Sequence, residues 1–118
     1  MYQNILRLRT VYGTVNVSSP GDSNVKDVIL MVGTGAASQV NLPDSPSIGE
    51  TYTIKDTTGS AATNNMAINT SPVQGNPIED GTLNVSGGYT LTLATNYESV
   101  TLTWNGLMWM IIASHKYP

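Results

Sequence analysis

Residues 100–111 contain two short runs of alternating apolar and polar residues, separated by the dipeptide Asn105-Gly106. The first run is Val100-Thr101-Leu102-Thr103-Trp104, and the second is Leu107-Met108-Trp109-Met110-Ile111. An Asn-Gly pair between two such runs predicts a two-residue hairpin of type I′, because both residues tolerate the positive φ angles that this turn requires. The pattern therefore predicts two antiparallel strands near the end of the chain.

The two-residue turn also predicts a register. It pairs Trp104 with Leu107 and Leu102 with Trp109, which places the large apolar side chains of both strands on one face. The opposite face is only partly polar, so we expect it to contact another subunit. The residues predicted to lie in a subunit interface are Thr101, Thr103, Met108 and Met110, together with Arg7 and Arg9 near the start of the chain.

The rest of the chain shows the same short alternation between clusters of turn residues. Gly, Pro, Asn, Asp and Ser interrupt every apolar stretch before two helical turns are complete, so no helix of normal length is expected. Residues Val28–Val32 form a continuous apolar run, which predicts a strand buried on both faces. We count about nine or ten short strands and no convincing internal repeat. The fold class is therefore all-β, an antiparallel β-sandwich or a barrel.

Composition excludes several classes of function. The chain has 118 residues, enough for one domain, and only 11% of them are charged. The net charge is −3 and the chain contains no cysteine, which argues against disulfides and thiolate catalysis. No apolar run is long enough to span a bilayer, and no signal peptide is visible. Nucleic acid is not expected as a partner because the five basic residues are scattered: Arg7, Arg9, Lys26, Lys55 and Lys116.

No catalytic, metal or cofactor site emerges from the remaining polar residues. The chain has one histidine, His115, which lies close to the C-terminus and is expected to be solvated. Glu79 and Asp80 are adjacent and precede Gly81; an acidic turn explains them better than a hard-cation site, because no spaced series of oxygen ligands accompanies them. We therefore expect a protein that is not an enzyme, with no catalytic residue, no metal and no cofactor.

Several motifs, in their order and spacing, resemble a β-rich virion module of tailed phages. The resemblance covers roughly residues 39–112 and has no counterpart before them. It rests on Val40-Asn41-Leu42-Pro43, on Ile48-Gly49-Glu50-Thr51-Tyr52-Thr53-Ile54-Lys55-Asp56, on Met66-Ala67-Ile68-Asn69, on Ile78-Glu79-Asp80-Gly81 and on Asn96-Tyr97-Glu98-Ser99 before the hairpin. It implies a trimeric, jelly-roll-like β-sandwich of the kind found in capsid decoration proteins, head fibres and tail-fibre tips. It implies no catalytic residues.

From this resemblance we expect a structural protein, a homotrimeric decoration (cement) protein that stabilises the phage head. Its partners would be copies of itself and the major capsid protein, on the capsid surface of the virion, after synthesis in the host cytoplasm. The chain starts at Met1 and lacks a repetitive shaft, which favours a decoration protein over a fibre. Residues 1–38 would form an N-terminal arm with the first strands, contacting a subunit or the capsid, and residues 39–118 the core module. The alternative is a receptor-binding tip or head-fibre domain that recognises cell-surface glycan through Tyr97.

Overall fold

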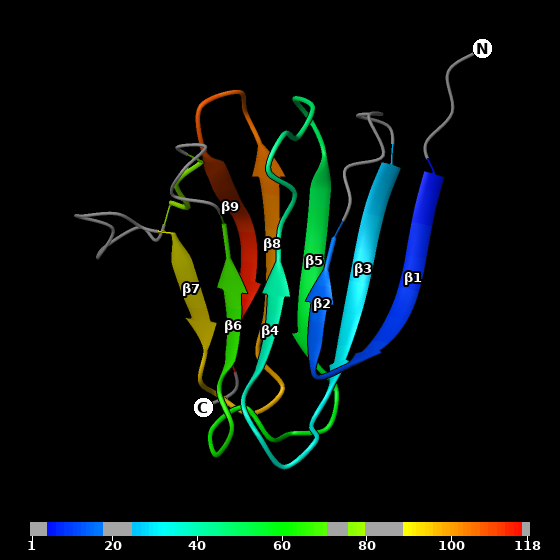
Figure 1. Cartoon of the computed structure of the whole chain (residues 1–118), viewed down its shortest axis with the longest axis vertical. Coiled ribbons are helices and arrows are strands. Elements are labelled where there is room, and N and C mark those ends of the chain that lie inside the picture. Colours follow the sequence, from blue (N-terminus) through cyan, green and yellow to red (C-terminus); the bar gives the residue numbers. More distant parts are fainter. Residues whose placement is uncertain (1–4, 18–24, 71–75, 80–88, 117–118) are drawn as a thin grey trace.

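The computed structural model describes residues 5–17, 25–70, 76–79 and 89–116, and these contain nine strands in two sheets and no helix (Figure 1). The five-stranded sheet has the order β1-β3-β5-β8-β9, and the four-stranded sheet has the order β2-β4-β6-β7. The strands are β1 (Ile5–Tyr12), β2 (Thr14–Asn16), β3 (Val25–Val32), β4 (Ser38–Asn41), β5 (Thr51–Asp56), β6 (Met66–Asn69), β7 (Thr90–Leu93), β8 (Ser99–Trp104) and β9 (Trp109–His115). The all-β prediction is confirmed.

Both sheets are mixed, so the prediction of a purely antiparallel fold is wrong. The chain crosses from one sheet to the other after β1, β2, β3, β4 and β5, and each sheet therefore receives successive strands that run in the same direction. Strands β1, β3 and β5 pair in parallel, as do β2, β4 and β6. The antiparallel pairs are β5 with β8, β6 with β7, and β8 with β9. The spacing of turn residues along the sequence predicts short strands, but it does not predict which of the two sheets each strand joins.

Three successive passes of the chain, residues 5–17, 25–42 and 51–70, each place one strand on each sheet. Equivalent residues of the passes stack in register, with Asn16 opposite Asn41 and Asn41 opposite Asn69. Their side chains are hydrogen-bonded in a row: Nδ2 of Asn41 donates to Oδ1 of Asn16 at 2.7 Å, and Nδ2 of Asn69 donates to Oδ1 of Asn41 at 3.1 Å. The amide of Asn41 both donates and accepts, so this asparagine ladder joins the strands through side chains as well as backbone.

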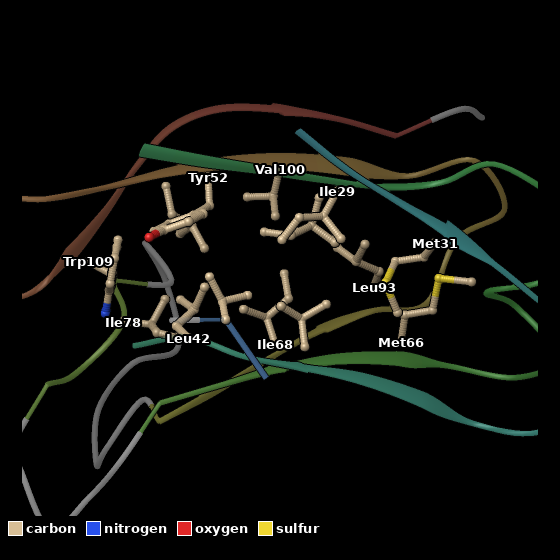
Figure 2. Packing of buried hydrophobic residues seen from close by; sticks show 14 of the residues in the cluster. Ile29, Met31, Leu42, Tyr52, Met66, Ile68, Ile78, Leu93, Val100 and Trp109 are labelled. Carbon is tan, nitrogen blue, oxygen red and sulfur yellow. The ribbon is translucent and has the colours of Figure 1, made fainter. Parts of the chain in front are cut away.

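The hydrophobic core fills the space between the two sheets (Figure 2). Ile29, Tyr52 and Val100 approach from the five-stranded sheet, and Ile68 and other aliphatic side chains meet them from the opposite layer. Trp109 is fully buried, with its ring centroid 5.6 Å from that of Tyr52. Each fully buried aliphatic side chain of this kind contributes about 1.5–3 kcal/mol to folding. The inward positions of each strand alternate with outward ones, which fixes the face that the five-stranded sheet turns away from the core.

The hairpin between β8 and β9 exists, but its predicted register is wrong. Trp104 pairs with Trp109 instead of Leu107, and Leu102 pairs with Ile111. Oδ1 of Asn105 accepts the backbone N–H groups of Leu107 and Met108, both at 2.8 Å, which extends the connection beyond two residues. Gly106 alone has a positive φ in this loop, whereas a type I′ turn needs two such residues. The register moves by two residues from Leu102 to Trp104, and by three from Thr101 on, because a bulge lies between Thr101 and Leu102. The two-residue shift keeps Trp104, Leu102 and Ile111 on their predicted face.

The predicted boundary between residues 38 and 39 falls at the start of β4. Strands from both sides of it are hydrogen-bonded to one another, β3 to β5 in one sheet and β2 to β4 in the other. The division into an N-terminal arm and a core module stays a prediction.

Candidate interaction surface

The face of the five-stranded sheet that points away from the core forms the largest continuous surface defined by regular strand register, and we call it the outer face. One complete row crosses all five strands at Leu8, Val28, Thr53, Thr101 and Ala113. This row contains no charged residue. On either side of it, Lys26 occupies one neighbouring row, and Lys55 and His115 occupy the other. The outer face therefore has an uncharged centre with basic residues towards its ends.

The threonine hydroxyls of the outer face are hydrogen-bonded within the sheet. Thr53 and Thr101 are joined at 2.9 Å between their Oγ1 atoms, and Thr51 donates its hydroxyl to Thr103 at 3.1 Å. Thr103 in turn is 3.3 Å from the carbonyl oxygen of Glu50, to which its hydroxyl donates. Because these hydroxyls already have partners, the threonines present mainly their methyl groups outward. The centre of the face is thus less polar than its composition indicates.

Strand β3 supplies the apolar part of the outer face. The run Val28–Val32 is predicted from the sequence to be buried on both faces. Ile29 and Met31 point inward and are fully buried, as predicted for one face. Val28, Leu30 and Val32 point the other way and are only half-buried. In the described part of the chain, no element covers them. Leu8 and Tyr12 of β1 continue this apolar surface, each with 67% of its surface exposed.

The structure brings some of the predicted interface residues together and separates others. Thr101, Thr103 and Met110 share the outer face and are half-buried, and Met108 lies beside them in the hairpin loop. Arg9 points to the opposite face of β1, where Nη2 lies 2.6 Å from Oδ2 of the buried Asp27. The side chain of Arg7 lies outside the described residues. Arg9 therefore acts within the chain, where its charge balances a buried carboxylate.

Asp56 is fully buried and accepts more backbone hydrogen bonds than any other described carboxylate. Its two oxygens accept backbone N–H groups from Thr58, Gly59, Ser60 and Ala61 in the loop after β5, and from Tyr97 before β8. Burial by itself raises the pKa of Asp56, but the backbone hydrogen bonds, led by that from Tyr97, outweigh this effect and hold the pKa below its usual value. Asp56 is therefore an ionised anchor for two loops, a role that the sequence analysis missed.

Three further carboxylates are buried, and each has a partner within the chain. Asp27 pairs with Arg9, as described above. Oε1 of Glu50 accepts the hydroxyl of Tyr52 at 2.7 Å, and its Oε2 accepts the N–H of Ser47 at 2.5 Å. Oε1 of Glu98 accepts the N–H groups of Ala94 and Thr95. The signal for these roles is weak in sequence. Glu50 follows Gly49 and Glu98 precedes Ser99, as in ordinary turns, and Asp27 lies between Lys26 and Val28 within β3. Such carboxylates hold backbone in place and leave few lone pairs for a substrate.

The acidic turn and the histidine occupy separate places. Glu79 lies beside β9, where its Oε1 accepts the N–H of Ile111 at 3.2 Å. Asp80 and Gly81 lie outside the described residues, so the question of an acidic turn or a cation site there stays open. His115 is exposed at the end of β9. Among the described residues, no three acidic or histidine side chains are grouped closely enough to hold a metal ion.

Tyr97, the residue named for glycan contact, is 45% exposed and has a positive φ of 65°. One side of its ring lies close to Gly59, where a Cβ atom would be only 2.6 Å from the ring. The ammonium of Lys55 lies 5.9 Å from the ring centroid and donates to the Tyr97 carbonyl oxygen at 2.7 Å. The ring is therefore already engaged by two neighbours, which limits the area that a sugar could stack on.

Two hollows occur in the described surface, and neither gathers catalytic groups. One, of about 300 Å³, lies on the four-stranded sheet and is lined by Ala37, Ser38, Gln39, Asn65, Ala67 and Thr92. The other, of about 170 Å³, lies where β7, β8 and β9 approach one another, and Glu98 is its only carboxylate. Since Glu98 already holds two backbone N–H groups, neither hollow offers the paired acid and base that hydrolysis requires.

Comparisons with known proteins add no assignment. No protein-family model matches the chain, and a search of curated proteins returns no match. No helix in the described ranges is both long enough and apolar enough to cross a membrane. The resemblance to the phage virion module stays a prediction from sequence.

Proposed function

We propose that this chain is a structural protein that acts by self-association: a homotrimeric decoration protein of a phage capsid, with no enzymatic activity. The two sheets around one core are proposed to form a β-sandwich of the jelly-roll class. The observation that carries the proposal is the uncharged centre of the outer face, the row from Leu8 to Ala113. The free energy falls when a second protein surface removes an uncharged, partly apolar surface of this kind from water.

Two further features support a structural role. Of the six carboxylates that the structure describes, four are buried and bound within the chain, so the described surface carries less charge than the composition implies: Asp27, Glu50, Asp56 and Glu98. Weak surface charge lowers the electrostatic cost of bringing copies together. The major capsid protein would be the second partner, and the stabilisation would come from buried surface shared between subunits, not from chemistry.

Native mass spectrometry across a range of protein concentrations tests the self-association. We expect a species of three times the 12.6 kDa chain mass. Met110→Glu and Thr101→Glu each place a charge in the outer face and should abolish the species of three times the chain mass. Thr92→Glu, an exposed position on the four-stranded sheet, is the matched control and should leave the trimer intact. Circular dichroism confirms that each variant is folded. A wild-type chain that stays monomeric at all concentrations would refute the proposal.

The capsid role has its own test, the copy number of this chain in purified parent particles relative to the major coat protein. A number comparable to that of the coat protein supports decoration of the head. A far smaller number moves the chain to the tail or to a single vertex, where receptor binding through the Tyr97 region becomes the leading function. Absence from the particle overturns both.

A further inference from the structure

The two edge strands of the five-stranded sheet, β9 and β1, differ in how the rest of the chain covers them. The free edge of β9 is occupied by residues 77–79: Trp109 donates to the carbonyl of Pro77 at 2.8 Å and accepts the N–H of Glu79 at 2.8 Å. The carboxylate of Glu79 takes the next N–H, that of Ile111. Because an unprotected edge strand pairs readily with other strands, this segment protects the first part of the β9 edge, from Trp109 to Ile111.

The edge of β1 has no such protection among the described residues. Strand β1 is eight residues long and pairs with β3 without a register shift. It contains no proline, no lysine and no bulge, three features that keep edge strands from pairing; its charged residues are Arg7 and Arg9, and the charge of Arg9 is paired with Asp27. On its outward side, Leu8 and Tyr12 are each 67% exposed and Thr10 is exposed between them. Figure 1 shows β1 at the margin of the molecule, beyond β2.

We propose that the β1 edge is a docking site for β1 of a second copy of this chain, in an antiparallel pair with its twofold axis at Thr10. Pairing of β1 with β9 of another copy would give an open, head-to-tail array, and residues 77–79 obstruct that pairing at Trp109–Ile111. Pairing of β1 with itself closes after two copies, because the same edge is used on both sides. The five-stranded sheets of the two copies then form one continuous ten-stranded sheet.

The sequence of β1 is complementary to itself in this register. An axis at Thr10 places Leu8 opposite the second copy's Tyr12, and Arg9 opposite the second copy's Val11. Aliphatic–aromatic pairs of this kind stabilise antiparallel strands, and no like charges oppose one another. An axis at Arg9 would bring two arginines together, and an axis at Leu8 would place position 7, also arginine, opposite Arg9. Charge thus selects the register at Thr10.

This contact is additional to the proposed trimer. It rests on the proposed function, decoration of a capsid, only for the place where the contact would form. Trimers that cover a closed shell face their neighbours across twofold axes, where a twofold strand pair fits. The contact itself depends only on β1 and is testable in the isolated chain. Its failure would leave the outer-face trimer untouched, and failure of the trimer would leave β1-linked dimers.

Cysteine cross-linking tests the register, because the native chain has no cysteine. In Thr10→Cys, the two new thiols lie directly opposite each other, and oxidation or a short bifunctional maleimide should give a covalent dimer at least about tenfold faster than in Thr92→Cys, whose thiols meet only by collision. A mixture of Leu8→Cys and Tyr12→Cys should cross-link, whereas each alone should react no faster than the Thr92→Cys control. Denaturing gels separate covalent dimers from monomers, whether or not trimers form.

Two results would overturn the inference. Equal rates for Thr10→Cys and Thr92→Cys would show that the β1 edges do not meet. Rapid cross-linking of Leu8→Cys in a Met110→Glu background, in which the outer-face contact is absent, would show that they meet in another register. All four substituted side chains are exposed, so the variants should fold as the wild type does, which thermal melting monitored by circular dichroism verifies.

Discussion

The backbone N–H of Tyr97 donates to Oδ2 of Asp56 at 3.0 Å, across 41 residues of sequence. Asp56 ends β5, and Tyr97 precedes β8, the antiparallel neighbour of β5. The same carboxylate holds the loop from Thr58 to Ala61. One buried charge therefore binds two loops at one end of the five-stranded sheet, and the ammonium of Lys55, which donates to the Tyr97 carbonyl, adds a second contact to one of them.

Replacement of this charge is the first prediction. Asp56→Asn puts an amide NH₂ against backbone N–H donors, and we expect the free energy of unfolding to fall by about 2–4 kcal/mol, because buried donors lose their acceptor. Urea denaturation measures the change. Asp44→Asn, at an exposed position, is the control and should stay within about 0.5 kcal/mol of wild type. Similar losses in both variants would contradict the anchoring role.

The second prediction concerns acid. The pKa of Asp56 is lowered in the folded chain, so at acidic pH the unfolded chain binds more protons and stability rises with pH. The stabilisation is complete above the unfolded pKa of about 3.9 and is lost as the pH falls through the lower folded pKa. Thermal melts from neutral to strongly acidic pH should therefore show the difference between wild type and Asp56→Asn shrinking below about pH 4. A difference that stays constant down to the lowest pH would contradict this. Asp44→Asn should follow the wild-type profile.

The sequence predicts the faces of the strands better than their partners. Alternation correctly places Trp104 and Trp109 inward and Thr101 outward, because side-chain direction follows from local backbone geometry. The hairpin register is predicted wrongly because the side chain of Asn105 accepts two backbone N–H groups, which in a type I′ turn would be free to pair between the strands. The parallel pairs escape as well, because they join strands that are separated by a complete strand of the other sheet.

The outer face is partly visible in the sequence. The apolar run Val28–Val32 predicts burial on both sides of a strand, and the structure buries one side within the chain and leaves the other half-buried. The role of Asp56 is not visible in the same way, since Asp followed by Thr57, Thr58 and Gly59 has the composition of an ordinary turn. Only the long-range bond from Tyr97 distinguishes it.

The asparagine ladder gives the third prediction. Asn41 makes hydrogen bonds to both neighbours, whereas Asn16, at the end of the row, makes one. Asn41→Ala should lower the free energy of unfolding by about 1–2 kcal/mol, and Asn16→Ala by roughly half as much, because a side-chain hydrogen bond contributes about 0.5–1.5 kcal/mol. Asn65→Ala, at an exposed position, is the control. A loss in Asn16→Ala equal to or larger than that in Asn41→Ala would show that the ladder does not contribute as a row.

The contact between Gly59 and Tyr97 gives the last prediction. Gly59 has a φ of +73°, and a Cβ at this position would be 2.6 Å from the tyrosine ring. Gly35 has a similar φ of +83°, but a Cβ there would meet nothing within 4 Å. Gly35→Ala therefore measures the cost of a left-handed alanine alone, about 1–2 kcal/mol. Gly59→Ala should cost more, because it adds displacement of the ring to the same backbone strain.

A double-mutant cycle separates the two contributions to the Gly59→Ala loss. In a Tyr97→Ala background the ring is absent, and the cost of Gly59→Ala should fall to that of Gly35→Ala. The coupling free energy between positions 59 and 97, measured by urea denaturation, should then be about 1–3 kcal/mol. A coupling near zero would mean that the exposed ring swings aside freely and does not restrain the loop. A large coupling would instead show that Tyr97 packs on Gly59 as firmly as its backbone binds Asp56, which keeps the ring out of reach of a sugar.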